Sequence, residues 1–295
     1  MSSPQFDARR QLVHLLTPEG LPRAMLFDLF ARIDVYRTAL LADAHNAAVS
    51  ETGRSVMDGV GTEAEQAEVG FGIAEPDTGA LPRIVMAFYE TDAPAQAGLM
   101  LAAGHKKWRC VQAPRKLDAA HDNPGTIAAW CAPGDTLVLR HPASGAAHAV
   151  AACLAPGIRI INVADGLHAA PLAALCDVAQ LWRRLPELNT RVIALVGDLR
   201  ANARLRCVIH MLTTLGVPQV SVVHTSDALP PGAARLGAHV YAVSESAAGT
   251  ASADVVMSYG DDLVFHGLPA AQGDEPDLAH AAVFMAVYDV MVGQV

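Results

Sequence analysis

Short apolar runs alternate with longer segments of helical spacing along most of this chain, and this alternation constrains its fold most. The runs are rich in Val, Ile and Leu, as is typical of strands buried on both faces of a parallel sheet. We expect strands at 84–89, 108–112, 136–139, 159–162, 191–196, 217–224, 238–243 and 253–257. A strand followed repeatedly by a helix predicts parallel βαβ units and an α/β fold.

The helical segments follow from apolar spacing and from the residues that end them. We expect helices at 21–41, 93–104, 125–131, 145–154, 171–185, 202–215 and 278–292. Gly216 and Gly237 stand where helices end, as glycine often does. The segment 43–81 is irregular and rich in Gly, Ala, Glu and Thr, which predicts a mobile connection or an insertion.

Composition limits the classes of function. The 295 residues carry a formal net charge of −9 without a cluster of Lys and Arg, so we expect no nucleic-acid binding. Met1 to Arg10 is polar, unlike a signal peptide, and no apolar run is long enough to span a membrane. The five cysteines are scattered without zinc-ligand spacing, which predicts reduced thiols, a cytoplasmic location, no metal and no cofactor.

Five segments carry a resemblance to a known family. They are 88–96 (FYETDAPAQ), 139–148 (LRHPASGAAH), 162–177 (NVADGLHAAPLAALCD), 196–204 (VGDLRANAR) and 266–269 (HGLP). From about Leu12 to the last helix, their order and spacing resemble the aspartate/ornithine carbamoyltransferase family, most closely its aspartate branch.

The resemblance implies two Rossmann-like parallel-sheet domains. The first would hold residues 1–184 plus 279–295, with 43–81 as an irregular linker or insertion. The second would hold residues 185–278. The C-terminal helix would return to the first domain and make it discontinuous.

The first family motif has lost its phosphate-binding groups. Members of the family place a Ser-Thr-Arg-Thr-Arg run after a strand, where hydroxyls, arginine and helix N-terminal amides hold carbamoyl phosphate. Here the matching residues are Asp92, Ala93, Pro94, Ala95 and Gln96. Asp92 puts a carboxylate where the resemblance places a phosphate. From the residues alone, Asp92 instead caps a helix whose first turn contains Pro94.

The second motif, His-Pro-x-Gln, is also degenerate. Its His, which polarises the carbamoyl carbonyl in the family, aligns with Ala170, and its Gln aligns with Ala173. His168 lies two residues upstream. We expect it to be a loop residue rather than a substitute catalyst.

The groups that bind aspartate in the family are missing too. An aspartate-binding Arg aligns with Ala203. Arg200, Arg204 and Arg206 are near enough to replace it, but we expect them to form a solvated helix face. The loop that reaches a neighbouring subunit would fall at 116–126 without its pattern. The long loop after the strand at 254–257 is effectively deleted, because only 258–265 separates that strand from 266.

A few family groups remain. The resemblance implies that the Arg of the Arg-His-Pro motif reaches carbamoyl phosphate and that two carbonyls of a Leu-Pro pair contact its amino group. Candidates for residual ligand binding are therefore Arg140, His141, His168, Leu268 and Pro269. They either hold a small anion weakly or are relics of framework geometry.

Three functions remain open. The first is a catalytically silent homologue, a pseudoenzyme that forms a homotrimer or a multiple of it, alone or with an active paralogue or another enzyme. The second is a repurposed enzyme acting on a less charged small molecule through Asp92, Gln96, Arg140, His141, His168, Arg200 and the carbonyl of Leu268. The third is a residual aspartate carbamoyltransferase of pyrimidine biosynthesis.

Overall fold

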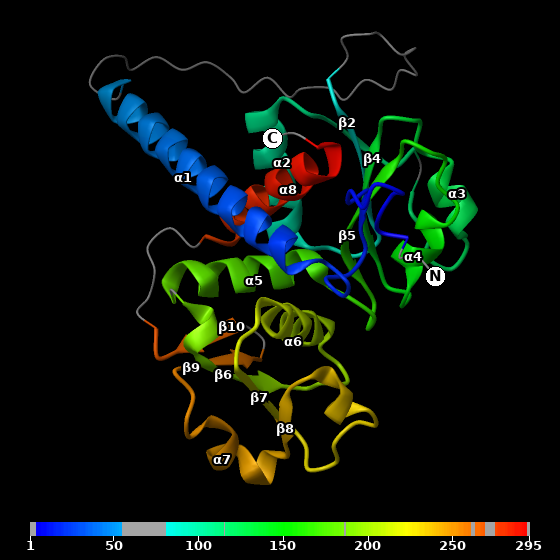
Figure 1. Ribbon diagram of the computed structural model, residues 1–295. Helices are drawn as coiled ribbons and strands as arrows, with labels where there is room; N and C mark the ends of the chain where they lie inside the picture. Colours follow the sequence, from blue (N-terminus) through cyan, green and yellow to red (C-terminus); the bar gives the residue numbers. More distant parts are fainter. Residues whose placement is uncertain are drawn as a thin grey trace.

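The computed structural model describes residues 4–54, 81–114, 116–185, 187–260, 263–268 and 275–293. They form two five-stranded sheets with helices packed against them (Figure 1). The strand orders are β1-β5-β4-β2-β3 and β10-β9-β6-β7-β8. All strand pairs are parallel except β9 with β10. The expected α/β fold with two parallel sheets is confirmed.

The first sheet contains β1 (His14–Leu15), β2 (Arg83–Phe88), β3 (Arg109–Gln112), β4 (Thr136–His141) and β5 (Arg159–Asp165). The side chains of each strand alternate between two apolar layers. In β2, Ile84 and Met86 join the larger core, whereas Val85 and Ala87 join a smaller one on the other face. Because both faces are covered, the strands read as continuous apolar runs.

The helices divide between these two faces. On the larger-core face lie α1 (Arg23–Arg54), α2 (Ala93–Lys106) and α8 (Pro276–Val292), and on the other lie α3 (Pro124–Ala128) and α4 (Ala146–Ala151) (Figure 1).

The second sheet contains β6 (Val192–Gly197), β7 (Gln219–His224), β8 (His239–Tyr241), β9 (Val255–Tyr259) and β10 (Leu263–His266). Helix α6 (Ala203–Leu215) lies between this sheet and α5 (Pro171–Arg184), which connects the two halves of the molecule (Figure 1). The short helices are α7 (Ser246–Thr250), η1 (Leu188–Thr190), η2 (Ala233–Leu236) and η3 (Val243–Glu245). The division into 1–184 plus 279–295 and 185–278 stays a prediction.

Helix α8 returns to pack on α1 and α2, as predicted. Gly98 permits the close approach of α2, because a Cβ there would stand 2.5 Å from the Cβ of His280. Lys106 of α2 pairs with the buried Asp289 of α8 at 2.8 Å, and Tyr36 of α1 donates a hydrogen bond to the same carboxylate. Burial lowers the pKa of Lys106, but its bonds to Asp289 and Tyr36 outweigh this effect and raise it.

One prediction about local structure is wrong, and one strand was not predicted. The prediction that 43–81 is irregular fails for 43–54, because α1 continues to Arg54; alanines sustain the helix where the apolar spacing weakens. Residues 55–80 lie outside the described residues. The sequence did not predict β10, which pairs antiparallel with β9 immediately after that strand ends at Tyr259.

Candidate functional site

The side chain of Asp92 caps the N-terminus of α2. Asp92 accepts a hydrogen bond from the backbone N–H of Ala95 at 3.2 Å through Oδ1, and Pro94 lies in the first turn. The predicted cap is therefore confirmed. Because the side-chain oxygen already satisfies one of the free amides of the helix, an incoming anion must compete with this carboxylate.

The second carboxylate oxygen of Asp92 holds Arg140. The Arg140 Nη1 donates to Asp92 Oδ2 at 3.0 Å, and Nη2 lies 3.5 Å from Glu90 Oε2. A register shift between Leu139 and Arg140 interrupts the pairing of β4 with β5. Such bulges redirect side chains near functional sites. Two carboxylates thus surround one guanidinium, and the local charge is negative.

His141 belongs to the framework of the sheet. It is buried, and its Nδ1 accepts the backbone N–H of Ala143 at 3.0 Å. Its ring packs edge-on against Tyr89, with centroids 4.5 Å apart. Burial lowers the pKa of His141 against the opposing effect of nearby carboxylates, so its ring is neutral at pH 7. Its Nε2 is buried and has no hydrogen-bond partner among the described residues.

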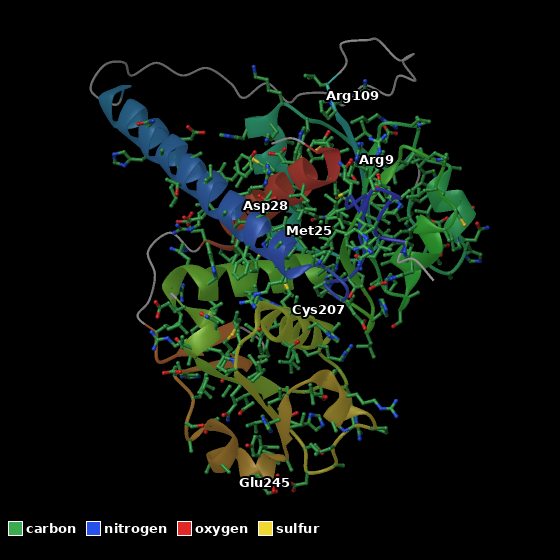
Figure 2. The ribbon with its side chains drawn as sticks, viewed as in Figure 1. Arg9, Met25, Asp28, Arg109, Cys207 and Glu245 are labelled. Atoms are coloured by element: carbon green, nitrogen blue, oxygen red, sulfur yellow. The ribbon has the colours of Figure 1, made fainter. Side chains whose placement is uncertain are left out.

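The alanines at the other family positions provide only methyl groups. Ala170 precedes α5 without a side-chain hydrogen bond, and its backbone N–H donates to Cys207 Sγ at 3.4 Å. Cys207 lies on α6, between the two halves of the molecule (Figure 2). Burial raises the pKa of Cys207 to about 11, so this thiol is protonated at pH 7. The remaining positions are Ala93 and Gln96 in the first two turns of α2, Ala173 in α5, and Ala203 at the start of α6.

The prediction of a solvated arginine face on α6 is wrong for two of the three arginines. Arg204 donates to both carboxylate oxygens of the buried Asp177, with Nε at 2.6 Å, and Tyr259 donates to the same group at 3.2 Å. The charge and hydrogen bonds of Asp177 raise the pKa of Arg204 against the effect of burial. Arg206 donates to the carbonyls of Leu167 and Leu199.

These contacts fasten α6 to α5 and to the turn before it, so neither cation is available for a ligand. Arg200 is the exposed member of the three, and it donates to the carbonyl of Ala228 at 3.2 Å. Leu268 is half-buried against the core, and Pro269 lies outside the described residues. Lys116 is exposed.

His168 lies in the turn before α5, where the sequence predicted a loop residue, and it has two neighbouring partners. Its Nδ1 lies 3.2 Å from Oδ1 of the fully buried Asp165, and its ring meets the ring of His148 edge-on at 5.0 Å. Burial, followed by the charge of His168, lowers the pKa of His148. Sequence reasoning missed His148 as a site residue because twenty residues separate it from His168.

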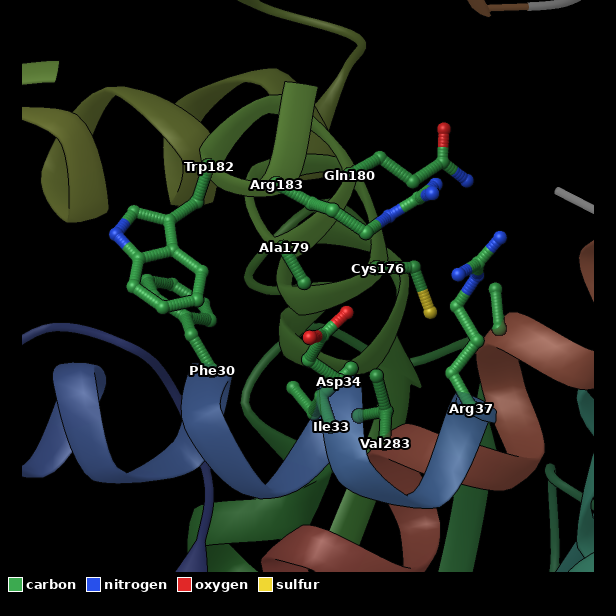
Figure 3. A pocket seen from close by; sticks show the side chains of 11 residues that line it. Phe30, Ile33, Asp34, Arg37, Cys176, Ala179, Gln180, Trp182, Arg183 and Val283 are labelled. Carbon is green, nitrogen blue, oxygen red and sulfur yellow. The ribbon is translucent and has the colours of Figure 1, made fainter. Parts of the chain in front are cut away.

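A pocket opens on another side of the molecule, between α1, α5 and α8 (Figure 3). It is lined by apolar side chains that include Phe30 and Trp182 and by the charged side chains of Asp34, Arg37 and Arg183. It contains none of the family positions, so it is separate from the site around Arg140. None of the helices in the described part of the chain combines the length and hydrophobicity that a bilayer crossing requires.

Part of the chain is similar in sequence to a known catalytic subunit. No protein-family model matches the chain. A stretch of 126 residues is 42% identical to the aspartate carbamoyltransferase catalytic subunit of Saccharopolyspora erythraea, covering 42% of this chain and 40% of that protein. The chain therefore matches about two fifths of the length of this curated relative.

Solved structures resemble the chain over nearly its whole length. The catalytic subunit of M. jannaschii aspartate transcarbamoylase has a TM-score of 0.63 at 15% identity, covering 96% of this chain and 98% of that one. The Trypanosoma cruzi aspartate transcarbamoylase in complex with N-(phosphonacetyl)-L-aspartic acid has a TM-score of 0.60 at 16% identity, covering 97% and 98%. At such low identity these structures establish the fold alone.

Proposed function

Because this chain resembles the aspartate carbamoyltransferases in sequence over 126 residues and in fold over nearly its whole length, we propose that it is a catalytically silent homologue. It keeps the scaffold and acts as an assembly or regulatory subunit. One observation carries the proposal: the carboxylate of Asp92 caps α2 and binds Arg140, the cation that the family resemblance assigns to carbamoyl phosphate.

The chemistry of carbamoyl transfer explains why this arrangement is inactive. The substrate is a multiply charged phosphate, and negative charge develops on the carbonyl oxygen in the transition state, so the reaction depends on oriented cations and donors. Losing a single oxyanion donor typically costs about 2.7–4 kcal/mol of barrier. Here the phosphate clamp, the polarising His at Ala170 and the aspartate anchor at Ala203 are absent together.

Arg204 and Arg206 supply no replacement. They lie close to Ala203 in sequence, but they hold Asp177 and two backbone carbonyls. Withdrawing Arg204 to bind an aspartate substrate would leave a buried carboxylate without its cation, which is strongly unfavourable. We therefore assign Arg204 and Arg206 a structural role.

The assembly role rests on the family resemblance. We expect a cytoplasmic homotrimer or a multiple of it, alone or with an active paralogue or another enzyme. Light scattering after size-exclusion chromatography measures the mass of the particle. A particle of one 30.9 kDa chain at all concentrations would contradict the assembly role.

Activity assays test the silent state directly. The purified chain is incubated with carbamoyl phosphate and either aspartate or ornithine, and carbamoyl-aspartate and citrulline are measured. An active aspartate carbamoyltransferase is the positive control, and a preparation from cells with an empty vector sets the background. We expect no product above that background. Product formation that increases with the amount of chain would refute the proposal.

A repurposed enzyme of the same fold is the second candidate. The meeting of His148, Asp165 and His168 favours it, because open α/β sheets bind ligands at the carboxyl ends of their strands. A thermal-shift screen with uncharged and singly charged metabolites tests this candidate. A metabolite that stabilises the wild type but not the Arg140→Ala variant would support it over the silent homologue.

A further inference from the structure

Two histidines and one aspartate from separate segments meet at the edge of the first sheet. His148 lies on α4, Asp165 is the last residue of β5, and His168 lies in the turn before α5. One potential ligand atom from each residue lies within 4.8 Å of the other two. The His168 Nδ1 is already 3.2 Å from Asp165 Oδ1.

The ring of His148 has an unsatisfied nitrogen, and the buried carboxylate of Asp165 has only a histidine as its possible cation within the described residues. The Nδ1 of His148 is buried and has no hydrogen-bond partner within the described residues. Asp165 is 0% exposed, and in the part of the chain that the structure describes it forms no ion pair with Lys or Arg. Buried polar atoms are nearly always satisfied, and buried charges are paired or coordinate metals. A cation bound by these residues would supply the missing partner of the His148 ring and balance the charge of the Asp165 carboxylate.

The surrounding backbone fixes Asp165 in place. Its Oδ1 accepts the backbone N–H of Ala169 at 3.0 Å and the side-chain amide of Asn162 at 3.1 Å. Asn162 in turn donates to the carbonyl of Leu16 at 2.8 Å. Hydrogen bonds of this kind orient the ligands of metal sites. They leave Oδ2 facing His168, whose Nδ1 is 3.3 Å away.

The turn that carries His168 is held against the segment that leads to His148. Gly166 has φ of 54°, and a Cβ there would stand 2.3 Å from the carbonyl oxygen of Pro142. The backbone N–H of Leu167 donates to Ser144 Oγ at 3.0 Å. Only glycine fits so close to the neighbouring backbone. The two histidines are thus brought together by packing outside their own side chains.

We propose that His148, Asp165 and His168 bind a divalent transition metal ion of the zinc class, with a water molecule as the fourth ligand. Imidazole and carboxylate are common ligands of such ions, and three protein ligands with an open position are typical of reactive sites. With metal–ligand distances of about 2.0–2.1 Å, the ligand atoms of a tetrahedral site lie about 3.3 Å apart. The His168–Asp165 pair already has this spacing, and the ligand atom of His148 lies within 4.8 Å of both, so a small movement of the His148 side chain completes the site.

Metal titrations of the untagged, chelator-treated chain test this site. Zinc binding is measured by calorimetry and cobalt binding by visible absorption, which reports tetrahedral coordination. We expect one equivalent to bind, and we expect His148→Ala and His168→Ala each to weaken binding at least tenfold. The matched control is His121→Ala, which removes an exposed histidine paired with Asp118 at 2.8 Å and should leave binding unchanged.

The proposal would be overturned by the absence of saturable metal binding to the folded wild type, or by equal metal affinity in the wild type and His148→Ala. A thiolate-to-cobalt charge-transfer band would also overturn it, because it would assign the metal to cysteine. Circular dichroism checks the fold of each variant, and His148→Gln replaces His148→Ala if the alanine variant is unfolded.

Discussion

Neutralising Asp92 should open the anion site at the start of α2. Asn at this position keeps the cap, because its side-chain oxygen still accepts the N–H of Ala95. It removes the charge that lies 3.0 Å from Arg140. We therefore expect the Asp92→Asn variant to remain folded and to bind inorganic phosphate more tightly than the wild type does.

The size of the gain follows from the position of the carboxylate. Two unit charges about 4 Å apart interact by about 1 kcal/mol in water and about 4 kcal/mol near a protein surface. The Asp92 side chain is 22% exposed, which places it between these limits. Removing its repulsion and releasing Arg140 should contribute about 2–4 kcal/mol, or a roughly 30- to 700-fold lower Kd for phosphate.

Calorimetry at low and at moderate salt measures this Kd. The control is Asp28→Asn, which changes the net charge equally but removes a surface carboxylate paired with Arg32 on α1. The double variant Asp92→Asn/Glu90→Gln should bind phosphate more tightly still, because Glu90 also faces Arg140. Equal phosphate affinity in the wild type and Asp92→Asn would refute the conclusion that Asp92 occupies the anion site.

Three further predictions concern stability. Gly98→Ala should destabilise the chain by about 1–3 kcal/mol because α8 leaves no room for a Cβ. In Gly104→Ala, a control in the same helix, the added Cβ meets no atom within 4 Å, so this variant should be as stable as the wild type or more stable. Urea unfolding measures the free energy of unfolding of both variants. Arg204→Ala should cost about 3–5 kcal/mol because it leaves the buried carboxylate of Asp177 without its cation. Arg32→Ala should cost less than about 1 kcal/mol because its partner Asp28 is 49% exposed, and similar losses in the two variants would contradict a structural role for Arg204. Burial, followed by the charge of Arg159, lowers the pKa of His14 from its ordinary 6.5 to about 4. The fold therefore favours the neutral ring, and the stability that this contributes is fully present above pH 6.5 and is lost as the pH falls to 4. The His14→Gln variant should therefore lose less stability than the wild type between pH 7 and pH 4.5 in urea titrations, and an equal loss would contradict this cause.

The sequence predicts the elements well because their signals are local. Apolar runs, the Asp92 cap and the proline of the first turn identify β2 and α2 without knowledge of the fold. The same locality explains the errors. Alanines extend α1 to Arg54 although the apolar spacing weakens after Leu41, and pairing with β9 makes β10 a strand that carries no clear pattern of its own.

The candidate site depends on contacts that sequence spacing does not encode. Arg204 and Asp177 are twenty-seven residues apart, and only the packing of α5 on α6 buries the carboxylate and brings the guanidinium to it. His148 and Asp165 meet because Gly166 lets one turn approach another. A short-range search for histidines and acids therefore finds neither the ion pair nor the cluster.

Because α8 lies near the C-terminal end of the chain but packs on α1 and α2, the core around these helices cannot be completed until α8 has been synthesised. The faces of α1 and α2 that α8 covers stay exposed on the nascent chain until the residues of α8, about 170 positions after Lys106, leave the ribosome. At about 5–20 residues per second, this delay lasts roughly 10–35 seconds. A truncated chain that stops before Pro276 should therefore present an apolar surface to chaperones instead of a finished first sheet.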